Sequence, residues 1–269
     1  MLEKLNLKRE LSEKEFRKML PKLQRRLYDL EKAAWDNRIP SVIVFDGWDA
    51  AGKGSAVATL TARLDPRGFK VHPIQPPRTF ERGRPWLWRF WLRTPNRGEI
   101  AIFDKSWYMR VLEERVEGRI TDRECREAYR DIVDFERALA DDGAAIIKFW
   151  LHISKKEQKR RFKQLEKDPL NAWRVSERDW ERHEKYDEYL IAAERMFEMT
   201  DTEWGPWTIV EGTCQFWAQR KIFEHVIGVL EQHLGDRVPQ PLDLAPEKEK
   251  QDAGLRAALD AAESAAGVM

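Results

Sequence analysis

The segment Gly47–Ser55 has the residue types that cradle phosphate groups in enzymes. It reads GWDAAGKGS and stands between a short apolar run and a segment with helical spacing, which is the context that a P-loop requires. Glycines allow backbone N–H groups to turn toward phosphate oxygens, and the N-terminus of the following helix adds its positive end. The residues predicted to bind phosphate through this loop are Gly47, Ala50, Ala51, Gly52, Gly54 and Ser55.

Lys53 is the residue of this loop that would bring a full positive charge to a transferring phosphoryl group. We expect it on an exposed loop, where its replacement would leave the fold intact. The motif is imperfect, because Gly54 occupies the position at which Ser or Thr usually binds magnesium, and Ser55 follows one position later. A structural glycine turn is the alternative, but the strand–loop–helix context favours phosphate binding.

Two acids are expected beside Lys53. Asp104 ends the apolar run 99–104, and an acid at the end of such a strand matches the Walker B pattern, in which the carboxylate holds magnesium. Asp49 lies inside the loop, where it could replace the missing hydroxyl as a metal ligand or orient the acceptor oxygen. The alternative for Asp49 is a turn residue that bonds its own backbone. We expect these to be the only acids near Lys53, with Mg²⁺ as the ion and Mn²⁺ as a substitute.

Two short basic runs predict an anionic ligand on a chain whose net charge is only +1. Residues 78–97 contain six arginines and one acid, and residues 155–163 contain six basic residues and one acid. A solvated, salt-bridged surface is the alternative for either run. Trp86, Trp88 and Trp91 lie among the first arginines, an arrangement that can bind single-stranded nucleic acid. Their helical spacing favours packing into the core instead, and we expect no nucleic-acid partner.

The elements that must position these residues alternate between apolar strands and helices, which predicts an α/β fold with a five-stranded parallel sheet flanked by helices. The expected strands are 41–45, 69–74, 99–104, 144–151 and 206–211. The expected helices are 12–38, 55–64, 121–143 and a closing helix that carries Ile222, Val226 and Val229. Pro21 is expected to divide the first helix in two, because proline cannot donate a hydrogen bond in a helix interior.

We expect residues 1–235 to form one phosphotransferase domain. Residues 154–203 are predicted to form about two helices with no strand between them, which makes them a candidate lid. Residues 236–269 have few large apolar side chains and are expected to form a mobile tail. Two distant cysteines, an N-terminus without a signal-peptide core and the lack of an apolar run of about 20 residues favour a cytoplasmic protein. A disulfide framework, a zinc site and a membrane protein are disfavoured.

Several longer motifs, in this order and with this spacing, resemble the family 2 polyphosphate kinases. They are GWDAAGKG, LDPRGFKVHPI, LWRFW, IFDKSWYMRVLEERVEG, KFWLHISKKEQKRRF, KDPLNAWRVSERDW and TDTEWGPWTIVEG. They cover roughly residues 12–232, which is nearly the whole chain before the tail. The stretch WYMRVLEERVEG is most similar to the branch that phosphorylates AMP from polyphosphate.

The resemblance implies a P-loop kinase fold like that of thymidylate kinase, a helical lid, a magnesium-dependent reaction and a homo-oligomer. It implies that Lys53 contacts the transferring phosphoryl group, and that Asp49 and Asp104 serve magnesium and the acceptor. Four arginines would face phosphates, two of them from the start of the lid: Arg89, Arg110, Arg160 and Arg161. The expected reaction moves the terminal phosphoryl of inorganic polyphosphate to a nucleotide, AMP to ADP first and ADP to ATP second. Adenine nucleotides are the expected acceptors, with guanine nucleotides also open.

The sequence departs from the family at several positions. Lys105, which we assign to phosphate binding, stands where relatives usually have Arg, so it offers a point charge in place of a bidentate fork. Leu165 stands where many relatives have a lid arginine, and Thr213, Cys214 and Gln219 replace residues that are expected to be more polar or basic. These changes bear on the rate and the nucleotide preference more than on the reaction class.

Two other functions are compatible with a P-loop in this setting. An ordinary nucleotide or small-molecule kinase that uses ATP as the donor would have the same fold and the same loop. A binding module with a degenerate P-loop is the third hypothesis. The presence of Lys53, Asp49 and Asp104 together disfavours that module, because binding alone would not require all three.

Overall fold

The computed structural model describes residues 2–240 of the chain. Its centre is a parallel sheet of five strands in the order β2-β3-β1-β4-β5. The strands are β1 (Ser41–Gly47), β2 (Phe69–Pro73), β3 (Ile100–Asp104), β4 (Ala145–His152) and β5 (Trp207–Glu211). The central strand β1 pairs with β3 on one side and with β4 on the other. The predicted five-stranded parallel sheet is therefore confirmed.

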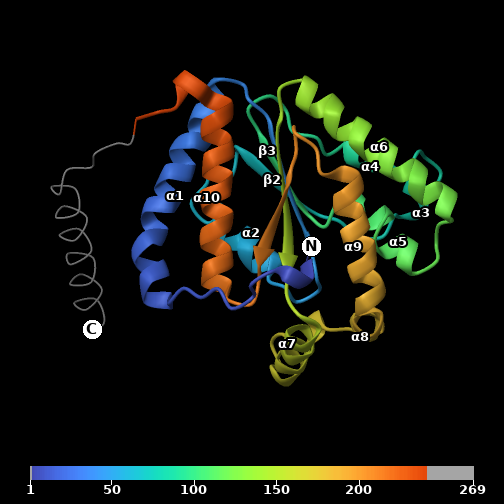
Figure 1. Cartoon of the computed structure of the whole chain (residues 1–269). Helices are drawn as coiled ribbons and strands as arrows, with labels where there is room; N and C mark the ends of the chain where they lie inside the picture. Colours follow the sequence, from blue (N-terminus) through green and yellow to red (C-terminus); the bar gives the residue numbers. More distant parts are fainter. Residues whose placement is uncertain (1, 241–269) are drawn as a thin grey trace, which may run out of the picture. The chain divides into compact units, whose positions relative to one another are not determined.

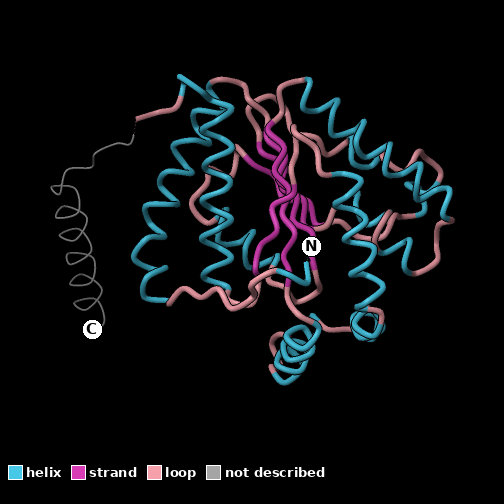
Figure 2. The backbone as a smooth tube through the Cα atoms, viewed as in Figure 1, coloured by secondary structure: helices cyan, strands magenta, loops and turns pink. Residues whose placement is uncertain are grey.

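Helices cover both faces of this sheet, as Figures 1 and 2 show. On one face lie α1 (Glu13–Asp36), α2 (Lys53–Thr61) and α10 (Gln215–Leu234), and on the other lie α6 (Asp122–Asp141) and α9 (Tyr186–Thr200). This double cover explains why β4 is buried along its whole length and reads as a nearly continuous apolar run. The core therefore consists of the sheet and the apolar sides of these helices.

Shorter elements lie in the connections. They are α3 (Thr79–Arg82), α4 (Trp88–Trp91), α5 (Glu113–Val116), α7 (Lys155–Lys167), α8 (Glu177–Glu184) and the 3₁₀ turns η1 (Leu2–Lys4), η2 (Trp107–Arg110), η3 (Ala172–Arg174) and η4 (Gly235–Arg237). Capping boxes are present at the starts of α1, α6 and α8. At α1 and α6, the side chains of Ser12 and Thr121 each accept from a backbone N–H that has no partner within the helix.

Pro21 does not divide the first helix, so that prediction is wrong. Helix α1 runs unbroken from Glu13 to Asp36 with Pro21 inside it. Pro21 lies on the exposed side, where the carbonyl that loses its hydrogen bond to the missing N–H can bond to water instead. The opposite side buries Phe16, Leu27 and Leu30, and this packing continues past the proline.

The segment 154–203 contains three α-helices (α7, α8 and α9) where about two were expected. Helix α9 buries Ala193, Met196 and Phe197 in the core, so it belongs to the layer that covers the sheet. Helices α8 and α9 are separated only by Lys185, and a boundary without proline or glycine gives no sequence signal. The part of this segment outside the core layer is therefore limited to α7, η3 and α8.

The first compact unit of the chain spans Met1–Val238. The predicted tail at 236–269 lies outside the described residues beyond position 240. In the part of the chain that the structure describes, no helix combines the length and the apolar character that crossing a membrane requires.

Candidate active site

The loop between β1 and α2 has the backbone shape that its glycines predict. Gly47 has φ of 132° and Gly52 has φ of 103°, a region in which residues with a side chain are rare. A Cβ on Gly47 would lie 2.3 Å from the carbonyl oxygen of Leu151 in β4. Because only glycine fits there, the loop can leave β1 in close contact with the neighbouring strand. The loop then runs directly into the N-terminus of α2.

Lys53 is not on an exposed loop, contrary to expectation. It is the first residue of α2, and 8% of it is exposed. Its Nζ donates to the carbonyl oxygens of Gly47 at 3.0 Å and Trp48 at 2.8 Å. The side chain thus closes the loop from within, and a bound phosphate would compete with these two carbonyls for the ammonium group.

One cavity of about 840 Å³ collects most of the predicted site residues. It is lined by the loop from Asp49 to Ser55 and by Asp104, Lys105, Arg160 and Arg161. Arg174, from the segment between α7 and α8, adds a fifth basic side chain, against three acidic ones. We call this space the P-loop cavity. Leu165 and Gln219, two departures from the family pattern, also line it, and Gln219 donates to Thr59 Oγ1 at 3.0 Å.

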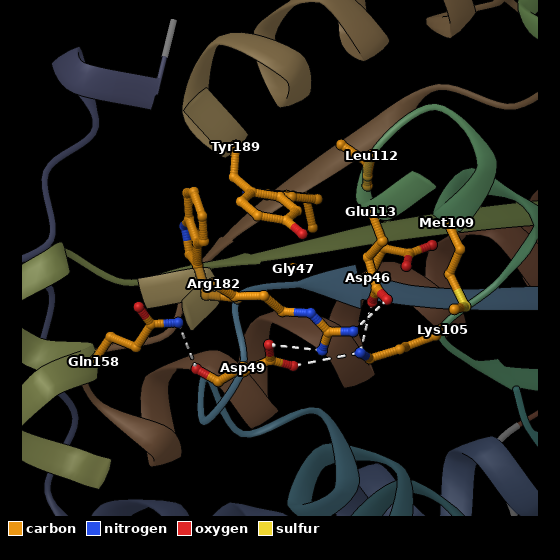
Figure 3. Close-up of a pocket in the computed structure, with 12 residues that line it drawn as sticks. Asp46, Gly47, Asp49, Lys105, Met109, Leu112, Glu113, Gln158, Arg182 and Tyr189 are labelled. Carbon is orange, nitrogen blue, oxygen red and sulfur yellow. Dashed lines mark hydrogen bonds and ion pairs between the residues drawn. The ribbon is translucent and has the colours of Figure 1, made fainter. Parts of the chain in front are cut away.

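The carboxylate of Asp49 forms ion pairs with two cations. It lies 3.4 Å from Lys105 Nζ and 3.4 Å from Arg182 Nη1 (Figure 3). Burial raises the pKa of Asp49, but the neighbouring positive charges outweigh burial and hold the pKa well below its usual range. These contacts disfavour the alternative in which Asp49 is only a turn residue that bonds its own backbone.

Arg182 and Glu113 complete this charge cluster and were missed by the sequence analysis. Arg182, from α8, lies 2.5 Å from Glu113 and 3.3 Å from Glu117 through separate nitrogens. Lys105 Nζ donates to Glu113 at 2.7 Å. Burial lowers the pKa of Lys105, but Asp49 and Glu113 raise it to about 12. The cluster surrounds a small pocket of about 40 Å³, which Gly47 also lines (Figure 3); we call it the central pocket.

Asp46 is a third acid near Lys53, so the expectation of only two was wrong. It stands one residue before the end of β1, is 4% exposed and accepts a hydrogen bond from Ser106 Oγ at 2.5 Å. Burial raises the pKa of Asp46 to about 6, although Ser106 and the charge of Lys53 act in the opposite direction. An acid at the end of a buried apolar strand is the signal that could have indicated it.

Arg89 and Arg110 line a second cavity, next to the central pocket. This arginine cavity has a volume of about 350 Å³ and is lined by four arginines (Arg82, Arg84, Arg89 and Arg110) and two glutamates. Within residues 2–240, no hydrogen-bond acceptor contacts the buried Nε of Arg89 or of Arg110. Met109 lines both the arginine cavity and the central pocket, whereas Asp49 and Lys105 line both the central pocket and the P-loop cavity. The central pocket therefore lies between the other two cavities and has a lining residue in common with each.

The tryptophans of the first basic run pack into the core only in part, because Trp86 and Trp88 are half-buried and Trp91 is 46% exposed. Trp86 donates to Asp131 of α6 at 2.9 Å and is packed against the core. The ring of Trp91 lies edge-on to Phe135 at 4.7 Å between centroids. Trp88 has the Arg84 guanidinium 4.7 Å from its ring centroid. Trp86 and Trp91 attach the arginine-bearing segment to α6, whereas Trp88 packs within that segment.

Arg160 and Arg161 reach the P-loop cavity in different ways. Arg161 donates to the carbonyl oxygens of Ala50 at 2.9 Å and Gly212 at 2.7 Å, so it fastens α7 to the loop. Arg160 has a side chain that is 60% exposed, and its guanidinium pairs with Glu157. The adjacent residues therefore have separable roles, one in holding the loop and one at the surface of the cavity.

The resemblance implies polyphosphate as the donor, and on that expectation Arg160→Ala should raise the KM for polyphosphate a few-fold while leaving the melting temperature unchanged. Arg161→Ala should also lower the free energy of unfolding, by about 1 kcal/mol, because the part-buried carbonyls of Ala50 and Gly212 lose this donor. Polyphosphate use by the wild type should weaken with salt, because ions screen attraction to a polyanion. An unchanged KM for polyphosphate in both variants would mean that this basic run is only a solvated surface.

The chain is similar in sequence to known proteins over most of its length. A model of the Polyphosphate kinase 2 (PPK2) family matches residues 10–237. A Polyphosphate:AMP phosphotransferase of Pseudomonas syringae pv. tomato is 40% identical over 235 residues, 86% of this chain and 47% of that protein. An ADP-polyphosphate phosphotransferase of Pseudomonas aeruginosa is 35% identical over 239 residues, 89% of this chain and 78% of that protein.

A solved structure agrees with these matches. The crystal structure of Polyphosphate Kinase 2 from Arthrobacter aurescens TC1 superposes with a TM-score of 0.84 at 27% identity, covering 94% of this chain and 93% of that one. The chain spans about half the length of the polyphosphate:AMP phosphotransferases that it matches. The family match extends from α1 to η4 and includes the whole site described above. The chain therefore belongs to the polyphosphate kinase 2 family.

Proposed function

We propose that this chain transfers the terminal phosphoryl group of inorganic polyphosphate to a nucleotide, with AMP as the first acceptor and ADP as the second. The observation that carries this proposal is that two positively lined cavities flank the central pocket, which shares Asp49 and Lys105 with one of them and Met109 with the other. A polyanionic donor and an anionic acceptor each require positive surroundings, and transfer requires that their reacting ends meet. The names of the AMP and ADP enzymes among the relatives support the same reaction.

In this proposal the donor lies in the P-loop cavity and the acceptor lies in the arginine cavity. Polyphosphate would bind along the loop N–H groups, Lys53, Arg160 and Arg174. The phosphate of the nucleotide would accept hydrogen bonds from Arg89 and Arg110, whose buried Nε groups are without partners among residues 2–240. Binding there would satisfy donors that are otherwise costly to bury.

The chemical step needs position and charge more than covalent catalysis. An oxygen of the nucleotide phosphate attacks the terminal phosphorus of polyphosphate in line with the bridging oxygen. The new P–O bond forms as the bond to the bridging oxygen breaks, and the electron pair leaves on a chain that is one phosphate shorter. Lys53 would turn from the carbonyls of Gly47 and Trp48 toward the oxygens of the transferring group and stabilise their charge.

The residues present fit a magnesium ion shared with the substrate. Within the described part of the chain, no group of three or more His, Cys, Asp or Glu side chains is arranged to hold a metal by itself. Asp49 and Asp104 nevertheless line the same cavity as Lys53, and Mg²⁺ in kinases is usually held by one or two carboxylates together with substrate phosphates and water. Asp49 and Asp104 would hold the ion, and when bound it would neutralise phosphate charge.

The segment of α7, η3 and α8 is proposed as the lid of this site. It brings Arg160, Arg161 and Arg174 to the P-loop cavity and Arg182 to the central pocket. Because this segment supplies basic side chains to both spaces, its position would set how tightly a polyanion is held. We also propose a homo-oligomer in solution, which sedimentation velocity on the purified chain would test.

The donor assay separates this function from that of an ATP-dependent kinase. We expect purified protein, Mg²⁺, AMP and long-chain polyphosphate to form ADP without added ATP. Parallel reactions with ADP, GMP and GDP, resolved by anion-exchange chromatography, would rank the acceptors. If ATP supports transfer to AMP and polyphosphate does not, the donor assignment is wrong and the ATP-kinase hypothesis replaces it.

A further inference from the structure

A buried polar cluster lies behind η2, the turn that carries Arg110. Its members are Trp107 and Tyr108 of η2, Glu136 of α6 and Lys148 of β4, none of them more than 1% exposed. The Glu136 carboxylate accepts from Trp107 Nε1 at 3.0 Å, from Tyr108 OH at 2.7 Å and from Lys148 Nζ at 2.8 Å. Lys148 also donates to Tyr108 OH at 3.0 Å and to the carbonyl oxygen of Thr200 at 2.8 Å.

This cluster has a composition that stability alone does not require. A buried ion pair loses the hydration of both charges, and well-packed apolar residues of similar size are often as stable. Here every Nζ hydrogen of Lys148 has an acceptor and both oxygens of Glu136 have donors. A fully satisfied network of this kind fixes orientation, and the parts that it orients are the adjacent rings of Trp107 and Tyr108.

Those two rings determine where η2 lies. On the other side of the turn, Ser106 accepts from the backbone N–H of Tyr108 at 3.2 Å and donates to Asp46. The turn is thus held from the site side by Ser106 and from the core side by Glu136. It joins Asp104, which lines the P-loop cavity, to Arg110, which lines the arginine cavity.

We propose that Glu136 and Lys148 are positioning residues, which hold η2 so that Arg110 is placed for the acceptor phosphate. This inference rests on the proposed function, in which Arg110 binds the nucleotide. Neither residue lines the P-loop cavity or the arginine cavity, so their effect passes through Trp107 and Tyr108. The consequence is specific: loss of the cluster impairs the acceptor side of the reaction more than the donor side.

The test compares Glu136→Gln with a destabilised control, Ile132→Ala. Ile132 is on the same helix, is fully buried and has no polar contact with η2. Tyr108→Phe serves as a milder second variant, because it keeps the Lys148–Glu136 pair and removes only the shared hydroxyl. Urea unfolding checks that each variant is folded under assay conditions. Calorimetric titration with AMP alone gives a Kd that does not depend on turnover.

We expect Glu136→Gln to raise the Kd and the KM for AMP about tenfold with the KM for polyphosphate within twofold of wild type, and Tyr108→Phe to do the same to a smaller degree. In an Arg110→Ala background, Glu136→Gln should add less than twofold, because residues that act as a unit are not additive. The Trp107 indole N–H resonance should shift in Glu136→Gln and stay in place in Ile132→Ala.

Two results would overturn the inference. One is an equal loss of AMP binding in Glu136→Gln and Ile132→Ala at equal stability. The other is an effect of Glu136→Gln that remains undiminished when Arg110 is absent. If the wild type binds AMP but transfers nothing from polyphosphate, the proposed donor fails, while the comparison of AMP affinities still decides the role of the cluster.

Discussion

Replacing Lys53 with methionine is expected to lower kcat by about 10³-fold, because the charge that stabilises the transferring phosphoryl group is lost. The same change removes the donor to Gly47 and Trp48, so a fall in the free energy of unfolding of roughly 1–3 kcal/mol should accompany it. Single-turnover transfer from polyphosphate to AMP measures the first effect, and urea unfolding measures the second.

Lys70→Met is the matched control for this measurement. Lys70 lies on β2, and its side chain is 56% exposed and paired with Glu99. An exposed pair of this kind contributes little to stability, so Lys70→Met should leave both kcat and the unfolding free energy nearly unchanged. If the turnover of Lys53→Met is close to that of Lys70→Met, the assignment of this loop as a P-loop is wrong.

The second large effect is expected from Asp49→Asn, which keeps the shape of the side chain and removes its charge. We expect a loss of about 10²- to 10³-fold in kcat, with a higher Mg²⁺ concentration needed for half-maximal activity. The variant would lose the metal ligand that we propose, together with the ion pairs to Lys105 and Arg182. Activity measured against Mg²⁺ and then Mn²⁺ separates the two causes, since only a ligand defect is relieved by more metal.

Asp104→Asn should show the same dependence on Mg²⁺ concentration. Its effect on the position of the lid should be smaller, because the ion pairs of Asp49 remain in place. If Asp49→Asn is fully active and its Mg²⁺ curve is unchanged, Asp49 has no role in metal binding and Asp104 must hold the ion without it.

The sheet and the loop could be predicted because their signals are local. Each strand is a short apolar run, and the glycines of the P-loop stand next to one another between a strand and a helix. Asp104 was predictable for the same reason, since it is placed by the strand that precedes it. In each of these cases the residues that specify the feature are neighbours in sequence, so the spacing alone carried the information.

Contacts between distant segments were not predictable in this way. Arg182 meets Asp49 across 133 positions, and no periodicity within α8 marks Arg182 as different from the other charges of that helix. The prediction that Pro21 divides the first helix was wrong because the effect of this proline depends on which side of α1 faces water. That orientation is decided by the packing of the opposite side of the helix. The prediction that Lys53 is exposed was wrong because its side chain donates hydrogen bonds to backbone carbonyl oxygens of the loop itself.

The attachment of α7 to the loop limits how a lid could swing. Arg161 holds the carbonyls of Ala50 and Gly212, and Gln158 donates to the carbonyl of Asp49 at 3.1 Å. The first two turns of α7 are therefore fixed to the loop. A rigid rotation of the whole helix would break these hydrogen bonds to the residues that line the P-loop cavity. Any hinge must lie beyond Arg161, and the other end of the segment is also attached, because α8 is separated from the core helix α9 only by Lys185. The part that could move is therefore the rest of α7, η3 and the start of α8, with Arg174 in η3.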